Sequence, residues 1–228
     1  MTRLAELQQI TLDGMQKLQR QFPGMFESGG CLFVGKHYAH PASRVLMLGI
    51  NPGLSPSRAL DVGLQTINYL LEESPGPKHQ YWANARKFFN SSPSLNAAVR
   101  LATFSLCCPY RTASWTDLSP DVRAALIDAS RPILNRIVRD CRPRLIIVAG
   151  VDGFRVLTET LGRSVHIDGT SSRGGDSGTY QWAAHPATFE SQSLTIAQVP
   201  HFSRANSRPK LEECARWLAD LNERLEAA

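Results

Sequence analysis

The sequence lacks the patterns that mark several protein classes. No apolar run is long enough to span a bilayer. The N-terminal stretch carries Glu6 and Asp13 and has neither the apolar segment nor the small-residue cleavage site of a signal peptide. The five cysteines are odd in number and form no CxxC pair, so neither a disulfide framework nor a cysteine metal site is expected. We expect a cytoplasmic protein without metal, cofactor or membrane partner.

Three enzyme motifs are also missing. There is no GxGxxG or GxxxxGK[ST] loop, so an enzyme that cradles the phosphate of a free nucleotide is weakly supported. An enzyme acting on a free nucleoside remains an alternative, and it would bind nucleosides tighter than oligonucleotides. A Ser–His hydrolase is disfavoured, because there is no GxSxG elbow and no evident acid partner for His201.

What is present fits one globular domain over residues 1–228. Hydrophobic residues make up 43% of the chain and charged residues 20%, which is an ordinary balance for a folded protein. The net charge of +5 favours a polyanionic partner, although many basic proteins bind no nucleic acid.

Four short apolar segments predict buried parallel strands, at residues 44–49, 102–107, 144–149 and 194–199. Each gap between them has room for a helix, as in βα crossovers. The predicted fold class is therefore α/β, with three α/β/α layers around a central four-stranded parallel sheet. Residues 169–178 are rich in Gly and Ser and predict a mobile loop, and residues 180–183 predict an edge strand.

Apolar residues at helical spacing predict helices over 4–18, 82–89, 120–137 and from about 209 to 225. Ser119 and Pro120 form an N-cap and first-turn pair for the third of these. Pro132 lies within it, which predicts a kink or two abutting helices. Cys107 and Cys108 lie in an apolar segment and are expected to be core residues.

Two predicted strands end in loops of unusual composition, where open parallel sheets bind ligands. Residues 49–55 read GINPGLS. Gly49 and Gly53 let backbone approach a flat ligand closely, and Pro52 stiffens the turn. The Asn51 carboxamide both donates and accepts hydrogen bonds, so it can position a water or read a base edge. An ordinary Asn-Pro-Gly turn is the alternative.

The second loop, residues 200–207, reads PHFSRANS. A neutral imidazole at His201 can donate a hydrogen bond to an atom that gains negative charge. Ser203 and the nearby backbone amides could hold a phosphate. Three positive charges follow, on Arg204, Arg208 and Lys210, and the alternative is a solvated basic loop before a helix.

GINPG after the first strand together with His-x-Ser after the last resembles the uracil-DNA glycosylase superfamily. The first loop is similar to that of the mismatch-specific uracil and thymine-DNA glycosylases, and the second to the His-Pro-Ser loop of the single-strand-selective monofunctional branch. The resemblance covers roughly residues 44–225. It implies a repair enzyme that hydrolyses the N-glycosidic bond of a flipped-out damaged base, uracil or another deaminated base. A monomeric, nucleoid-associated bacterial protein is then expected, with damaged or mismatched DNA as its partner.

The resemblance also implies roles for residues. Asn51 would orient the attacking water and His201 would stabilise the leaving base. Arg204 would be a wedge in the DNA or a phosphate contact, and Phe202 a wedge or a core residue. The base pocket would be formed by Gly49, Ile50, Pro52, Gly53, Leu64 as the stacking residue, and Leu106. DNA contacts would come from Ser203, Arg204, Asn206, Arg208 and Lys210.

The sequence departs from the family at Leu106, which stands where relatives carry a base-reading asparagine. Tyr110, Arg111 or backbone groups could read the base instead, or the base could be a purine such as hypoxanthine. Glycine at position 53, where uracil-specific branches carry tyrosine, implies room for 5-substituted pyrimidines. The iron–sulfur cysteine arrangement of some branches is not matched.

Four further expectations complete the prediction. Neither loop holds a lysine for a Schiff base, which implies a monofunctional enzyme that leaves the abasic site intact. Residues 81–89 would wall the base pocket or simply pack in the core. His40 and His185 each start a His-Pro-Ala segment, but His201 is favoured because it follows the last strand. The alternative function is a catalytically weak nucleic-acid-binding module with the same fold.

Overall fold

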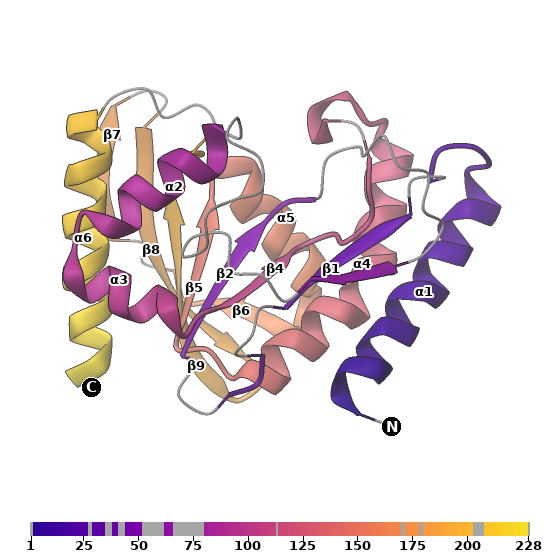
Figure 1. The fold of residues 1–228 in the computed structure, drawn as a ribbon, viewed down its shortest axis with the longest axis horizontal. Helices are drawn as coiled ribbons and strands as arrows, with labels where there is room; N and C mark the ends of the chain where they lie inside the picture. Colours follow the sequence, from indigo (N-terminus) through magenta and orange to yellow (C-terminus); the bar gives the residue numbers. More distant parts are fainter. Residues whose placement is uncertain are drawn as a thin grey trace.

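A computed structural model describes residues 2–26, 29–34, 38–40, 44–51, 62–65, 80–112, 114–169, 172–177, 180–202 and 208–227. Within these ranges the main sheet has seven strands in the order β4-β2-β5-β9-β8-β6, with β7 paired to β8 (Figure 1). The four strands at one end of this order are parallel, and they are β4 (Thr103–Leu106), β2 (Val45–Gly49), β5 (Leu145–Ala149) and β9 (Gln192–Val199). The α/β class is confirmed, and these four strands match the four predicted segments to within two residues.

The extent of the sheet was predicted wrongly. Beyond β9 it continues through antiparallel pairs, formed by β8 (Tyr180–Phe189), β6 (Val165–Ile167) and β7 (Ser172–Ser177). The expected edge strand over 180–183 is the first part of β8, which lies between β9 and β6. Pro186 in the middle of this strand hides it from sequence patterns, since proline normally marks a strand end. The expected loop at 169–178 likewise contains β7.

Helices cover both faces of the sheet, as the three-layer prediction requires (Figure 1). Along β5, Ile146 and Val148 face one apolar cluster, and Ile147 and Ala149 face the other. Because both faces of the strand are covered, its sequence is an unbroken apolar run. One cluster includes α1 (Arg3–Gln21), α4 (Pro120–Cys141) and α5 (Val151–Leu161), and the other α2 (Gln80–Asn90), α3 (Pro93–Arg100) and α6 (Arg208–Ala227). Two 3₁₀ turns span Trp115–Asp117 and Gly162–Ser164.

The start of α4 follows from its sequence. The Ser119 side chain accepts a hydrogen bond from the Val122 amide at 3.4 Å, and Pro120 occupies the first turn, so the predicted cap is confirmed. Pro132 lies inside one continuous helix, so the alternative of two abutting helices is wrong. No helix in the described ranges is both long and apolar enough to cross a bilayer.

A smaller parallel sheet lies beside the main one. It consists of β1 (Gly30–Phe33) and β3 (Val62–Gln65), and α1 lies against it (Figure 1). Tyr110, which follows β4, is fully buried, and its hydroxyl lies 3.3 Å from the carbonyl oxygens of Thr11 in α1 and Ala129 in α4. Tyr110 therefore fixes the segment after β4 to both helices.

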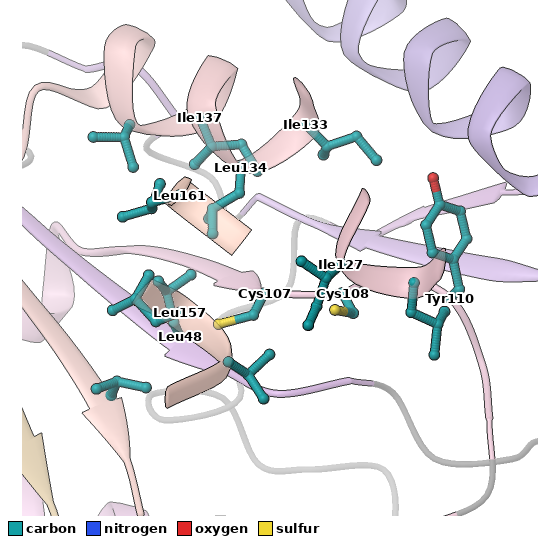
Figure 2. Packing of buried hydrophobic residues seen from close by; sticks show 14 of the residues in the cluster. Leu48, Cys107, Cys108, Tyr110, Ile127, Ile133, Leu134, Ile137, Leu157 and Leu161 are labelled. Carbon is teal, nitrogen blue, oxygen red and sulfur yellow. The ribbon is translucent and has the colours of Figure 1, made fainter. Parts of the chain in front are cut away.

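Cys107 and Cys108 begin that segment and are core residues, as predicted. Both are fully buried, and Figure 2 shows them among apolar side chains of α4 and α5, including Ile127 and Leu157. Burial raises the pKa of both thiols, that of Cys108 to about 12. The thiols therefore stay protonated at neutral pH and act as apolar filling.

Gly14 makes the contact of α1 with Tyr110 possible, which gives a stability prediction. A Cβ at this position would lie 2.1 Å from the Tyr110 hydroxyl oxygen, and that ring is fully buried and cannot swing away. Gly14→Ala should therefore lower the free energy of unfolding by about 1–3 kcal/mol, as overpacked cores do, despite the better helix propensity of alanine. Urea denaturation measures the change, with exposed Lys17→Ala as the control. An unchanged or stabilised Gly14→Ala protein would contradict the contact.

Candidate functional site

The two predicted catalytic residues lie at the same edge of the sheet. Leu48 of β2 pairs with Val148 of β5, and Val148 pairs with Gln198 of β9. Asn51 lies three residues after Leu48, and His201 lies three residues after Gln198. Their strands are two positions apart in the parallel sheet, so the paired positions Leu48 and Gln198 that precede them are separated by about 10 Å, given the usual spacing between strands. This separation is suited to one flat ligand held between two side chains.

The backbone before Asn51 is held by the segment after β4. The amides of Cys107 and Cys108 donate hydrogen bonds to the carbonyl oxygens of Gly49 and Ile50, at 2.9 and 2.8 Å. Residues 49–51 therefore leave β2 along a path that neighbouring backbone fixes. Ile50 is half-buried and packs against the cluster that contains α4 and α5.

The Asn51 side chain has a defined orientation. Its amide nitrogen, Nδ2, donates a hydrogen bond to the Thr112 hydroxyl at 2.7 Å. Thr112 is buried, and it belongs to the segment that Tyr110 fixes to α1 and α4. The carboxamide is half-buried and is held in one direction, which suits a group that must position a water or a base edge.

Gly150 separates the two loops at the end of β5. Its φ of +83° is unfavourable for any residue with a side chain. Its amide donates to the Val199 carbonyl at 2.7 Å, and a Cβ built on it would lie 3.3 Å from Cβ of His201. The His201 side chain therefore lies close to the backbone at the start of α5, with room for little more than a methyl group between them.

His201 also meets an aromatic ring of α2. The Tyr81 ring is edge-on to His201, with centroids 5.4 Å apart, and it makes a similar contact with Phe202 at 5.4 Å. Burial raises the pKa of Tyr81 above its ordinary value, so the phenol stays neutral. His201 is half-buried and lies close to both this ring and Gly150.

Phe202 is a core residue. Its side chain is fully buried against Phe88 and Phe89, with ring centroids 5.3 and 6.0 Å away. Of its two predicted roles, the DNA wedge is wrong and core packing is confirmed. The Phe202 carbonyl accepts a hydrogen bond from the side chain of Asn84, also buried, at 2.7 Å. Residues 81–89 thus hold His201 and Phe202 at the start of the second loop, whether or not they also contact a base.

Leu106 lies next to the first loop. It pairs with Gly49 across β4 and β2, and its Cδ2 would lie 2.9 Å from a Cβ on Gly49. Glycine at 49 therefore makes room for the leucine. Tyr110 and Arg111 were suggested as substitute readers of the base. The Tyr110 hydroxyl contacts carbonyl oxygens of α1 and α4 and therefore cannot read a base. The backbone amide of Arg111 donates a hydrogen bond to the carbonyl oxygen of Gly29.

The other predicted site residues are placed only in part. Leu64 lies in β3, paired with Leu32 in the smaller sheet, rather than in a loop of the main sheet. Arg208 is the first residue of α6, and Lys210 lies 3.6 Å from Glu213 in the same helix. An acidic side chain therefore lies close to one of the three positive charges that were predicted to contact DNA. The remaining predicted residues lie outside the described ranges: Pro52, Gly53, Ser203, Arg204 and Asn206.

Neither rival histidine lies at this edge. His185 is in the middle of β8, opposite Ile196, and its ring stacks on Phe154 with centroids 4.2 Å apart. Burial lowers the pKa of His185, which favours the neutral ring. His40 follows Tyr38, whose hydroxyl donates to Asp140 near the end of α4, and α4 ends just before β5 begins. His40 is thus near the amino ends of the strands.

Three residues of the site were not predicted from the sequence. Thr112 gives no signal, since its place beside Asn51 depends on the path of a loop. Asn84 was included only as part of a pocket wall. Gly150 could have been found, because a glycine between a buried strand and a helix is a common site of close approach. Within the described ranges no group of His, Cys, Asp or Glu side chains could hold a metal ion.

Comparison with models of known protein families and with curated proteins found no match to this chain.

Proposed function

We propose that the protein is a DNA glycosylase that releases a damaged base, uracil or another deaminated base, from a nucleotide flipped out of the duplex. The observation that carries the proposal is the row of paired residues across the sheet, from Leu48 through Val148 to Gln198. It puts an oriented carboxamide at Asn51 and a half-buried imidazole at His201 on one edge, two strands apart. A water-positioning group and a hydrogen-bond donor on opposite sides of one base are what glycosidic hydrolysis requires.

In the proposed reaction, the bond between the sugar C1′ and the base nitrogen breaks and its electron pair stays on the base. His201 donates a hydrogen bond to the base as this negative charge develops. A water positioned by Asn51 adds its oxygen to C1′ and releases a proton to solvent. An amide takes up no proton near neutral pH, so Asn51 orients the water without acting as a strong base and turnover is slow.

The products are a free base and an intact abasic site. No lysine occurs in either loop to form a Schiff base with the sugar, so the enzyme is monofunctional. Leu106 offers no hydrogen bond to a base edge, which relaxes selection among bases. Glycine at 53 leaves room for a 5-substituent. Deaminated purines and 5-substituted pyrimidines therefore belong among the substrates to be tested, beside uracil.

The direct test uses labelled oligonucleotides carrying uracil, hypoxanthine or xanthine, each single- and double-stranded, and a duplex in which thymine is mismatched to guanine. After incubation, alkali cleaves any abasic site and a gel displays the product. The control is the double variant Asn51→Ala/His201→Ala. Release from at least one lesion by the wild type alone supports the proposal, and strand nicking without alkali would contradict monofunctionality.

A second function, a nucleic-acid-binding module without catalysis, is favoured by one observation, namely leucine at 106 beside the first loop. The same oligonucleotides separate the two functions. Salt-sensitive binding without base release from any of them would establish the binding module.

The hydrogen bond from Thr112 to Asn51 gives a prediction of its own. Thr112→Val keeps the shape of the side chain but removes the hydroxyl, so the half-buried Asn51 carboxamide loses this hydrogen bond. We expect base release to slow by about tenfold, which corresponds to about 1.4 kcal/mol, because the carboxamide then samples other orientations. Single-turnover kinetics measure the change. Thr158→Val, at an exposed threonine hydroxyl of α5, is the control, and equal rates for both variants would refute the role.

A further inference from the structure

His201 belongs to a loop that α2 holds by two kinds of contact. Asn84 is 6% exposed, and its Nδ2 lies 2.7 Å from the carbonyl oxygen of Phe202. The two residues are 118 positions apart in the chain. A polar side chain is rarely buried in an apolar cluster unless its hydrogen bond is made, because an unmet partner costs about 1–3 kcal/mol. The bond therefore fixes the backbone directly after His201.

Tyr81 lies one helical turn before Asn84, on the same side of α2. Its ring contacts His201 and Phe202, each with centroids 5.4 Å apart. The Phe202 ring is in turn enclosed by Phe88 and Phe89 of the same helix. One helix thus holds the imidazole by a ring, and the residue after it by a hydrogen bond and three rings.

Gly150, at the end of β5, also lies close to the imidazole. A Cβ there would lie 3.3 Å from Cβ and 3.4 Å from the ring atom Cδ2 of His201, so the histidine leaves room for little more than a methyl group beside this backbone. Tyr81 and Gly150 both lie close to His201 and limit the space in which its ring can turn. A donor that is already aimed before the substrate arrives loses no free energy to reorientation during the reaction.

We infer that Asn84 and Tyr81 of α2 are positioning residues that hold the His201 imidazole in its working orientation. For its effect on rate this inference rests on the proposed function, whereas the orientation itself can be measured without any activity. Neither side chain is assigned to the chemistry, since both act through His201.

The kinetic test compares Asn84→Ala with Asn135→Ala. Asn135 is also a buried asparagine, but it lies in α4 on the opposite face of the sheet. We expect Asn84→Ala to lower the single-turnover rate of base release by about 10- to 100-fold, as loss of a supporting residue does at other sites. The affinity for the lesion oligonucleotide should stay within about twofold, because binding does not need the aimed donor. Asn135→Ala should keep the wild-type rate.

The spectroscopic test follows the imidazole ring itself by ¹H–¹³C NMR. The His201 signal is the one that disappears in His201→Gln. Asn84→Ala should shift or broaden it, because the Tyr81 and Phe202 rings move relative to the imidazole, while the signal of exposed His166 in β6 stays in place. If Asn84→Ala does not fold, Asn84→Ser replaces it, because serine is too short to reach the Phe202 carbonyl.

An unchanged His201 signal in the folded variant would overturn the inference. A shifted signal in a protein whose wild type releases no base would support the inference and reject the proposed function. A shifted signal with a wild-type rate of release would also overturn it, since the held orientation would then have no effect on the reaction.

Discussion

Replacing His201 with alanine should slow base release by about 100- to 1000-fold, the usual loss when a donor to a developing negative charge is removed. The side chain is half-buried beside Tyr81 and Gly150, and Asn84 holds the backbone directly after it, so its removal should leave that backbone in place. The change should fall on the chemical step. Single-turnover kinetics with saturating enzyme on the best lesion oligonucleotide measure it directly.

His166→Ala is the matched control for this variant. His166 lies in β6, and its side chain is 82% exposed at the far side of the sheet from β4. This control should keep the wild-type rate, and both variants should bind the oligonucleotide with similar affinity. A His201→Ala protein that releases base within about threefold of wild type, far from the loss expected of a removed donor, would remove the imidazole from the proposed mechanism.

Replacing Asn51 with alanine is the second large effect, with an expected loss of about 100-fold. The carboxamide holds a water where it can attack C1′, and a misplaced reactant commonly costs about this factor. Asn51 makes its hydrogen bond to Thr112 at the end of a backbone that Cys107 and Cys108 hold, so alanine changes the side chain but not the path of the loop. The measurement is again the single-turnover rate.

Asn51→Asp distinguishes orientation of the water from its activation. A carboxylate can accept a proton from the attacking water, which an amide cannot, and the Thr112 hydroxyl can turn to donate to it. We therefore expect Asn51→Asp to release base faster than the wild type. Asn135→Ala serves as the control for loss of a buried carboxamide. Equal rates for Asn51→Ala and the wild type would show that Asn51 has no part in the reaction.

The sequence predicts the parallel part of the fold because those strands are buried on both faces. A segment such as residues 145–149 has apolar side chains at every position, and a covered parallel strand has the same pattern. Once four such strands are placed, the carboxyl ends of the first and last must share an edge. The positions of Asn51 and His201 on one edge therefore followed from the strand assignment.

The antiparallel extension could not be predicted in the same way. β8 contains Pro186 and β7 contains two adjacent glycines, Gly174 and Gly175, and both residue types are depleted in strands. What makes them strands is pairing with β9 and with each other, which local sequence does not record. Tertiary context overrides propensity here.

The partners of the site were missed for a related reason. Thr112 meets Asn51 across 61 residues, and Asn84 meets Phe202 across 118. Neither contact leaves a periodic pattern in the chain, because each depends on where a loop or a helix end lies in space. Single polar residues in such positions become visible only when the fold is known.

The antiparallel extension also affects the strand from which His201 emerges. If the sheet stopped at its four parallel members, one flank of β9 would present open amide and carbonyl groups to any passing chain. Pairing with β8 closes that row, and β5 closes the other. Movement of β9 along its own axis would break the hydrogen bonds on both of its flanks at once. The pairing with β5 and β8 therefore fixes how far the imidazole lies beyond the carboxyl end of β9.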